Sequence, residues 1–218
     1  MKSEFVHLHN HSDYSLLDGA QKVSQLVDTI DDLKMDSVAL TEHGNMFSVL
    51  PYYKAAKKAG IKPIIGCEIY VAVGSRFDKK TTAEHGWGNN HLILLAQNYT
   101  GYKNLMKLVT AGYLEGFYYR PRVDIDLLRE YNEGLICMSA CLKGEVPERM
   151  LRGDYEGAKK AAVTFSEIFP NRYYLEIQNH GIPEEEANLK NMKKLSQELN
   201  LPLVCLLYTS DAADDVRG

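Results

Sequence analysis

Two histidines near the start of the chain are separated by one residue, in the run His9-Asn10-His11. Side chains two residues apart in an extended segment point to the same side, so both imidazoles can bind one metal ion. Asp18, seven residues after His11, can return from the following loop as a bridging carboxylate. The spacing of these side chains predicts a metal site.

Further metal-capable side chains lie at or near the ends of other apolar runs. Glu42 and His43 follow one such run, and Cys141 follows another. Glu68 has apolar neighbours on both sides, and a buried carboxylate is costly unless it is paired or bound to a metal. Imidazole, carboxylate and thiolate are ligands of borderline divalent metals such as Zn, Mn or Fe.

Other polar residues have two readings each. His91 precedes an apolar run, so it joins the same rim only if that strand starts earlier or the chain bends there. His180 follows an apolar run but can equally cap the next helix. Arg120 and Arg122 are either salt-bridge partners or phosphate contacts, and the pattern does not decide between these roles. Cys141 taken alone is equally consistent with a small buried apolar side chain that has no ligand role.

The proposed ligands indicate a reaction class. Metal ions a few ångströms apart clamp a phosphate diester and generate hydroxide at neutral pH. The sequence therefore predicts metal-assisted phosphoester hydrolysis.

Short apolar runs alternate with helix-like segments along the chain, and these elements must position the ligands. We expect strands at 5–8, 37–40, 62–71, 91–96, 134–139, 173–177 and 201–204. We expect helices at 22–33, 46–59, 102–114, 146–151, 155–169 and 183–199.

Such alternation favours an α/β fold, and the number of units favours a distorted TIM-like barrel of about seven parallel βα units, truncated at the seventh strand. In a barrel of this kind, functional side chains gather where the strands end and the loops to the helices begin. The candidate ligands other than His91 obey that rule.

Composition excludes several classes of protein. The chain has 218 residues, of which 45% are hydrophobic and 25% charged, and its formal net charge is −4. These values are ordinary for a globular domain and argue against bulk disorder and against a dedicated basic nucleic-acid-binding module. No apolar run has the roughly 18 residues of a membrane-spanning helix. The 4 Cys residues form no close pair, so we expect reduced thiols and a cytoplasmic protein.

Five segments of the chain carry a resemblance to a known family. They are FVHLHNHSDYSLLDG at 5–19, TEHGNMF at 41–47, AGIKPIIGCE at 59–68, GFYYRPR at 116–122 and CLKGEV at 141–146. Together they closely resemble the PHP (polymerase and histidinol phosphatase) domain of bacterial DNA polymerase III alpha subunits. The likeness extends from about residue 3 to Val204.

This resemblance implies a distorted barrel with a trinuclear centre that takes Zn or Mn, with Fe as a further option. The positions that match the family's metal ligands and catalytic residues are His9, His11, Asp18, His43, Glu68, His91 and Cys141. Family members that keep the full set are metal-dependent 3′–5′ exonucleases that proofread. The resemblance also implies DNA with a primer 3′ end as a partner, together with a sliding clamp, a proofreading subunit and a clamp loader.

The sequence departs from the family after Val204. The family continues there into a Thr-Asn-Asp-x-His segment that supplies the last two ligands, whereas no histidine follows His180 in this chain. We therefore expect an incomplete PHP domain at residues 1–204, belonging to the N-terminal part of a longer polymerase chain. We expect a non-native tail at 205–218, because that stretch resembles translated sequencing-adapter read-through.

Two alternatives remain at this point. One is a structural domain that braces the polymerase, and the other is a free-standing PHP phosphatase that acts on a small phosphate monoester. The segments at 59–68 and 116–122 argue against the phosphatase, because they match the polymerase in particular. With two ligands missing, we expect weak or no exonuclease activity from this chain.

Overall fold

A computed structural model describes residues 5–79 and 88–207. Its helices are η1 (Asp13–Asp18, a 3-10 helix), α1 (Val23–Asp32), α2 (Val49–Lys58), α3 (Tyr99–Leu114), α4 (Ile125–Glu130), α5 (Glu145–Leu151), α6 (Tyr155–Ile168) and α7 (Pro183–Leu199). Its strands are β1 (Ser37–Leu40), β2 (Lys62–Ala72), β3 (Asn89–Ala96), β4 (Arg122–Val123), β5 (Leu135–Met138), β6 (Tyr173–Asn179) and β7 (Leu203–Leu207).

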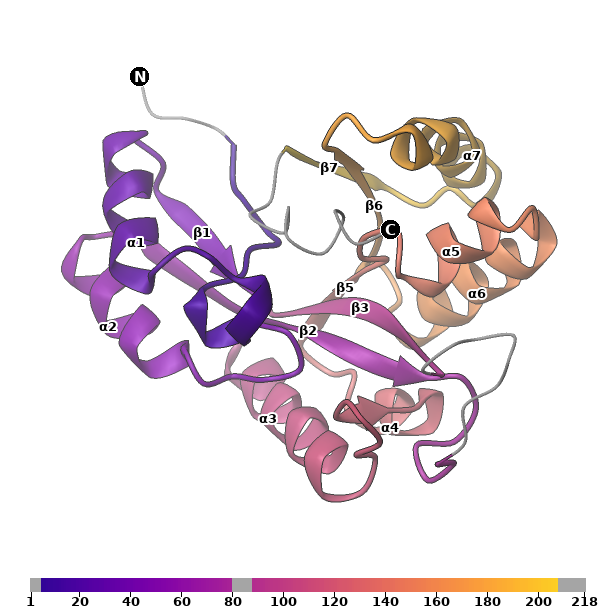
Figure 1. The fold of residues 1–218 in the computed structure, drawn as a ribbon, viewed down its shortest axis with the longest axis horizontal. Helices are drawn as coiled ribbons and strands as arrows, with labels where there is room; N and C mark the ends of the chain where they lie inside the picture. Colours follow the sequence, from indigo (N-terminus) through magenta and orange to yellow (C-terminus); the bar gives the residue numbers. More distant parts are fainter. Residues whose placement is uncertain (1–4, 80–87, 208–218) are drawn as a thin grey trace.

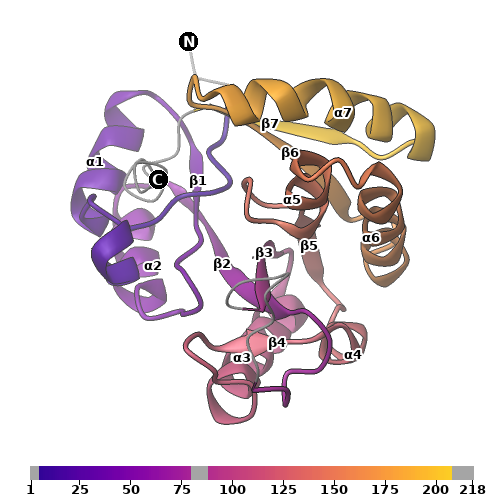
Figure 2. The same ribbon diagram turned by 45° about the vertical axis from the view of Figure 1, so that its right-hand side comes forward.

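The strands form one sheet in the order β1-β2-β3-β5-β6-β7, with β4 paired to β2. The sheet curls, and the helices lie around the outside of the curve (Figures 1 and 2). This α/β arrangement is that of a truncated TIM-like barrel, as the sequence predicts. Within the described residues, β1 and β7 are the two ends of the strand order, so the curve does not close on itself.

One strand departs from the predicted series of parallel units. β3 runs antiparallel to both of its neighbours, β2 and β5, whereas the other pairs in the sheet are parallel. Strand direction depends on the long connections between strands, which hydrophobic periodicity does not report. This reversal turns out to place one of the candidate ligands.

The first predicted strand is extended but is not a regular strand of the sheet. The Ala39 amide donates to the His7 carbonyl at 2.8 Å, and the Thr41 amide donates to the Asn10 carbonyl at 2.8 Å. The start of the chain therefore lies along β1. The remaining predicted elements correspond to observed ones, while the short η1, β4 and α4 went unpredicted, since two to six residues give little periodicity.

Alternate residues of the central strands face two different layers. On β3, Leu92 and Leu94 join the large cluster beneath the helices, whereas Ile93 and Leu95 join a small cluster inside the curve. On β2, Cys67 and the alternating residues after it belong to the outer cluster. Because side chains alternate between the faces of a strand, Glu68 faces the inside.

The helices cover the outer layer through amphipathic faces. In α1 the residues Val23, Leu26, Val27 and Ile30 are buried, at the spacing that places side chains on one face of a helix.

Within the described residues, no helix combines the length and the apolar character needed to cross a membrane.

Candidate metal centre

His9 and His11 project from the extended segment beside β1 toward the inside of the curved sheet. Between them, the side chain of Asn10 points the other way. The backbone amide of Asn10 donates to Thr41 Oγ1 at 3.0 Å, and its side-chain Nδ2 donates to the Ala39 carbonyl at 3.1 Å. These bonds hold the backbone so that both imidazoles are fully buried on the opposite side. The two imidazoles therefore lie on the same side of the segment.

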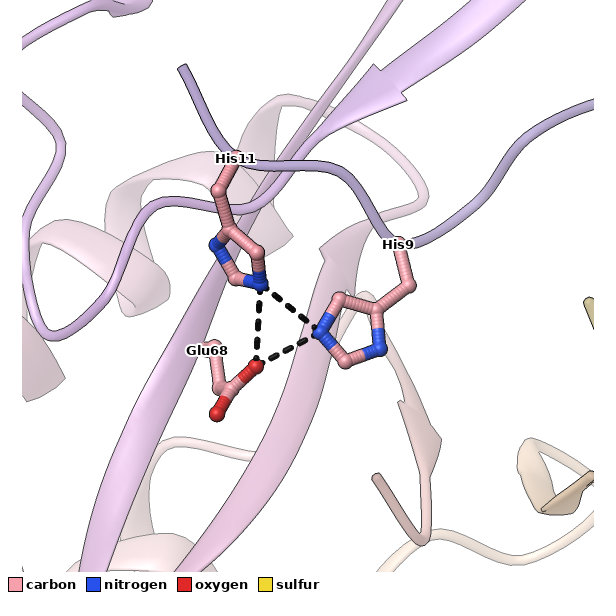
Figure 3. Close-up of side chains that lie close together, drawn as sticks. All are labelled: His9, His11 and Glu68. Atoms are coloured by element: carbon pink, nitrogen blue, oxygen red, sulfur yellow. Dashed lines mark hydrogen bonds and ion pairs between the residues drawn. The ribbon is translucent and has the colours of Figure 1, made fainter. Parts of the chain in front are cut away.

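Glu68 meets both histidines from β2 (Figure 3). His9 Nε2 lies 2.6 Å from Glu68 Oε2, His11 Nε2 lies 3.3 Å from the same oxygen, and the two Nε2 atoms are 3.0 Å apart. These three atoms form a close triangle within the buried interior.

The other oxygen of Glu68 faces a second set of side chains. His43 Nδ1 lies 3.4 Å from Glu68 Oε1, and His91 Nδ1 contacts that same oxygen. The ring of His43 stacks on the ring of His11 with centroids 3.9 Å apart. Cys141 Sγ lies 3.7 Å from His91 Nδ1, which adds a thiol at the edge of the cluster.

The antiparallel direction of β3 explains why His91 reaches this cluster. His91 pairs with Tyr70 near the end of β2, and Ile93 pairs with Glu68. Since β3 runs against β2, the beginning of β3 lies at the rim where β2 ends. β3 also starts at Asn89, before the predicted start at residue 91. The condition that this strand begins earlier than predicted is therefore met.

The donor set fits divalent metal ions. Burial alone raises the pKa of the Glu68 carboxyl, but the facing imidazoles, led by His91 and His43, hold it well below its usual range. Burial acts to lower the pKa of His9, but the carboxylates of Glu176 and Glu68 outweigh burial and raise it well above its ordinary value. A buried carboxylate shared by several imidazoles is the type of cluster that binds Zn, Mn or Fe.

Two overlapping ligand groups meet at Glu68. One consists of His9, His11 and Glu68, and the other of His43, Glu68 and His91. Of the predicted ligands, the structure therefore brings together His9, His11, His43, Glu68, His91 and Cys141. The backbone of Asp18 ends η1, and its side chain lies outside the described residues.

A family model, the PHP domain, matches residues 7–180 of the chain. The chain belongs to the PHP domain family. Curated relatives named DNA polymerase III subunit alpha include those of Borreliella burgdorferi, 52% identical over 93% of this chain, and Treponema pallidum, 47% identical over 93%. The relative from Aquifex aeolicus is 44% identical over 97% of the chain. This PHP domain spans only 17 to 18% of the length of these relatives.

Solved structures share the fold of this PHP domain at low sequence identity. An amidohydrolase from Chromobacterium violaceum, solved with sulfate and no metal, matches with a TM-score of 0.55 at 13% identity, over 94% of this chain and 87% of the other. A protein from Bifidobacterium adolescentis, assigned by prediction as a metal-dependent phosphoesterase, matches with a TM-score of 0.51 at 11% identity, over 92% and 86%.

Glu176 is a site residue that the sequence reasoning missed. It lies on β6 and is almost fully buried, and its Oε1 lies 2.7 Å from His9 Nδ1. Gln178 Nε2 donates to the same oxygen at 2.7 Å. The signal was available, because Glu176 sits between Leu175 and Ile177 and is thus as isolated among apolar residues as Glu68.

Glu42 holds the loop of the PHP domain that follows His11. The Ser12 amide donates to Glu42 Oε2 at 3.1 Å, and the hydroxyls of Ser12 and Ser15 also donate to the carboxylate. Ser15 Oγ in turn accepts from the His43 amide at 3.1 Å. This network ties the two histidine-bearing segments together.

The two arginines that sequence could not assign occupy different environments. Arg122 is 2% exposed and donates to the carbonyls of Gly116, Arg76 and Asp78, so its guanidinium braces the surrounding loops. Arg120 is exposed, and its guanidinium lies 5.4 Å from the centre of the Tyr70 ring.

Two further predictions concern residues after β6. His180 Nδ1 lies 2.5 Å from Glu185 Oε1, and the His180 amide donates to Glu185 Oε2 at 2.6 Å, so His180 engages the first turn of α7. Residues 205–207 continue β7, and the rest of the tail, 208–218, lies outside the described residues.

Proposed function

We propose that this PHP domain hydrolyses phosphodiester bonds at the 3′ end of single-stranded DNA with the aid of bound divalent metals. The observation that carries the proposal is the convergence of His9, His11, His43 and His91 on the two oxygens of Glu68. A buried carboxylate with imidazoles on both sides can be shared between neighbouring metal ions, which is the arrangement that phosphodiester hydrolysis uses.

The roles of the residues follow from their positions. Glu68 bridges the two ligand groups, His9 and His11 serve the first, and His43 and His91 serve the second. Cys141 adds a thiolate beside His91, and Asp18 is proposed as a further ligand from the family match. Divalent metals of the Zn, Mn or Fe class polarise a phosphoryl oxygen and lower the pKa of bound water when they are present.

Arg120 is the proposed phosphate contact. Its guanidinium is exposed and lies over Tyr70, whose ring centre is 5.1 Å from that of His91 and 6.5 Å from that of His43. A planar guanidinium binds phosphate oxygens well at such a rim. Arg122 is left out of this role because it donates to backbone carbonyls.

We infer that the domain operates within a larger replicative polymerase chain. Relatives at 44 to 52% identity are named DNA polymerase III subunit alpha, and they are far longer than this chain. In that setting the substrate is the primer 3′ end, and other replicase subunits are the expected partners.

Metal binding is the first test. The chain is stripped with a chelator and titrated with Zn or Mn, and we expect bound metal that is lost in the Glu68→Gln variant. Glu184→Gln is the matched control, because Glu184 is exposed on α7. A chain that purifies without metal, binds none on titration and still melts cooperatively would instead support a purely structural domain.

Activity is the second test. A 5′-labelled single-stranded DNA is incubated with the metal-loaded chain and with a version in which the Thr-Asn-Asp-x-His segment follows Val204. We expect the extended version to shorten the DNA from its 3′ end and the given chain to do so weakly or not at all. Failure of the extended version on DNA, with hydrolysis of a small phosphate monoester, would contradict the proposal and favour the phosphatase.

A further inference from the structure

Three aromatic side chains form a connected and exposed row on the surface near the metal centre. Phe47 is 64% exposed, Tyr113 39% and Phe117 47%. The ring centroids of Phe47 and Tyr113 are 6.4 Å apart, and those of Tyr113 and Phe117 are 6.2 Å apart. We call these three residues the aromatic row. Large apolar groups gathered at a surface usually mark a binding site.

Basic residues lie on α2, the helix that begins two residues after Phe47. Leu50, Tyr53, Lys54 and Lys57 share one exposed helix face, because positions three and four apart are neighbours on a helix. Within the described part of the chain, neither lysine forms an ion pair. Their positive charge is therefore available to a ligand.

The aromatic row is held against the metal centre by short polar and packing contacts. Asn45 Nδ2 donates to the His43 carbonyl at 3.0 Å, and the Phe47 amide donates to Asn45 Oδ1 at 3.0 Å. Gly44 has a φ of +63°, and an added Cβ there would lie 2.8 Å from the Tyr70 ring and 2.9 Å from Pro121. The segment that carries His43 thus packs closely on the turn that follows Phe117.

That turn carries Arg120, which lies beside the centre. Tyr118 and Arg120 form a tight turn in which Tyr119 has a φ of 58°, an unusual value for an aromatic residue. Arg120 at the end of this turn lies over Tyr70, which contacts His43 and His91. The exposed rings are therefore connected through this turn and Arg120 to the buried metal ligands.

We propose that the aromatic row, with Arg120 and the α2 lysines, binds single-stranded nucleic acid by stacking its bases and contacting its phosphates on the way into the centre. This inference rests on the proposed function and names the surface that delivers the substrate. Bases stack on exposed aromatic rings regardless of sequence, and lysine and arginine follow the phosphate backbone. The combination matches a substrate whose terminal phosphodiester must reach buried ligands.

Charge favours nucleic acid over a protein as the occupant of this surface. The acidic residue nearest in sequence, Glu115, is paired with Arg76, whose Nη2 lies 2.7 Å from Glu115 Oε2. Arg76 also binds Asp124, whose Oδ1 lies 3.1 Å from Arg76 Nη1. Lys54, Lys57 and Arg120 are exposed basic side chains. A polyanion complements these charges, even though the net charge of the whole chain is −4.

The test measures binding without hydrolysis. Fluorescence anisotropy of a labelled oligothymidylate is recorded with the full chain in EDTA. We expect Phe47→Ala and Phe117→Ala each to weaken binding about fivefold or more, which corresponds to the low end of the stacking energies for single bases. Lys54→Gln with Lys57→Gln should reduce the steepness of the salt dependence.

Tyr99→Ala is the matched control. Tyr99 is 72% exposed at the opposite end of α3, and Lys103 Nζ lies 5.2 Å from the centre of its ring. The Tyr99→Ala variant should bind the oligonucleotide as tightly as the unchanged chain does. Thermal melting in the same buffer shows whether each variant is folded.

The inference would be overturned if Phe47→Ala and Phe117→Ala both bind the oligothymidylate as tightly as the unchanged chain. So would variants that leave oligonucleotide binding unchanged but alter self-association or the capture of a polymerase fragment, because the surface would then be a protein interface. A chain that binds DNA through Phe117 but never hydrolyses it keeps the binding surface and loses the proposed hydrolysis. If the chain hydrolyses DNA and these substitutions change neither binding nor hydrolysis, the proposed hydrolysis stands and the proposed binding surface is lost.

Discussion

At the scale of single residues, the centre is organised around Glu68. Each of its oxygens faces a different pair of imidazoles, so one carboxylate serves two ligand groups. Removing a carboxylate from such a cluster leaves several buried imidazoles without the negative charge that they face, whereas removing one histidine leaves the others paired.

Glu176 is expected to tune metal affinity through His9 without being a ligand itself. Its carboxylate accepts from His9 Nδ1 at 2.7 Å, which leaves Nε2 directed at His11 and Glu68. Removing such a partner typically lowers metal affinity about 10- to 100-fold, so we expect a loss of that size for Glu176→Ala. Glu176→Gln should lose less, because its amide oxygen still accepts. Competition with a chelator measures both, and wild-type affinity in the alanine variant would contradict this role.

The metal-free chain should show a pH signature of the pair formed by His9 and Glu176. The pKa of His9 is raised well above 6.5 in the folded chain, so this pair stabilises the fold fully below the unfolded value and progressively less as pH rises through the folded value. Glu176→Gln should therefore cost more stability at pH 6 than at pH 9. Urea unfolding in EDTA at several pH values measures the difference. The exposed control Glu184→Gln should show no such trend, and a cost that grows with pH would refute the assignment.

At the scale of elements, close backbone packing sets the position of α3. An added Cβ on Gly101 would lie 1.8 Å from the Gly134 carbonyl oxygen, just before β5, and the Asn98 side chain caps the helix by accepting from the Gly101 amide at 2.9 Å. The helix thus starts where the chain passes directly against the loop that enters β5.

Gly101→Ala is expected to destabilise the protein although alanine is the better helix former. Helix propensity favours alanine over glycine by about 1 kcal/mol, but overpacking typically costs about 1 to 3 kcal/mol, and the clash here is with backbone that cannot rotate away. Thr110→Ala, at an exposed position of the same helix, should be neutral or slightly stabilising. Denaturant unfolding compares the two. A Gly101→Ala protein at least as stable as the parent would show that the helix can shift freely.

At the scale of the whole molecule, the centre joins distant parts of the chain. His9 and Glu176 are 167 residues apart in sequence, yet they share a hydrogen bond, and the ligands between them come from the loop after β1, from β2, from β3 and from the loop after β5. Metal binding to such a cluster requires the entire sheet to be in place, so it must be coupled to folding.

Metal should therefore raise the Tm of the whole chain. At a metal concentration 100 times the dissociation constant, the expected stabilisation is about 2.7 kcal/mol. For a domain of this size, that corresponds to a rise of roughly 5 to 10 °C. Thermal melts with Zn or Mn and with EDTA measure it, with Tyr99→Ala as the control that keeps the shift. A shift of the same size in Glu68→Gln would place the metal elsewhere.

Sequence by itself determined the local features of this protein. The spacing of His9 and His11, the isolation of Glu68 among apolar residues and the alternation of strands and helices all follow from the fixed geometry of neighbouring residues along one chain. The family motifs added His91 and Cys141, which the spacing alone left open. For these reasons the α/β fold and most of the candidate ligands were predictable.

Only the tertiary structure decided how distant segments meet. The reversed direction of β3, which brings His91 to the rim, depends on pairing with β2 and β5. The contact of Glu176 with His9 and the different surroundings of Arg120 and Arg122 likewise depend on partners far away in the sequence. Periodicity reports which face of an element is buried, but the identity of the group across from it is set by long-range packing, and chemistry at a buried site depends on that group.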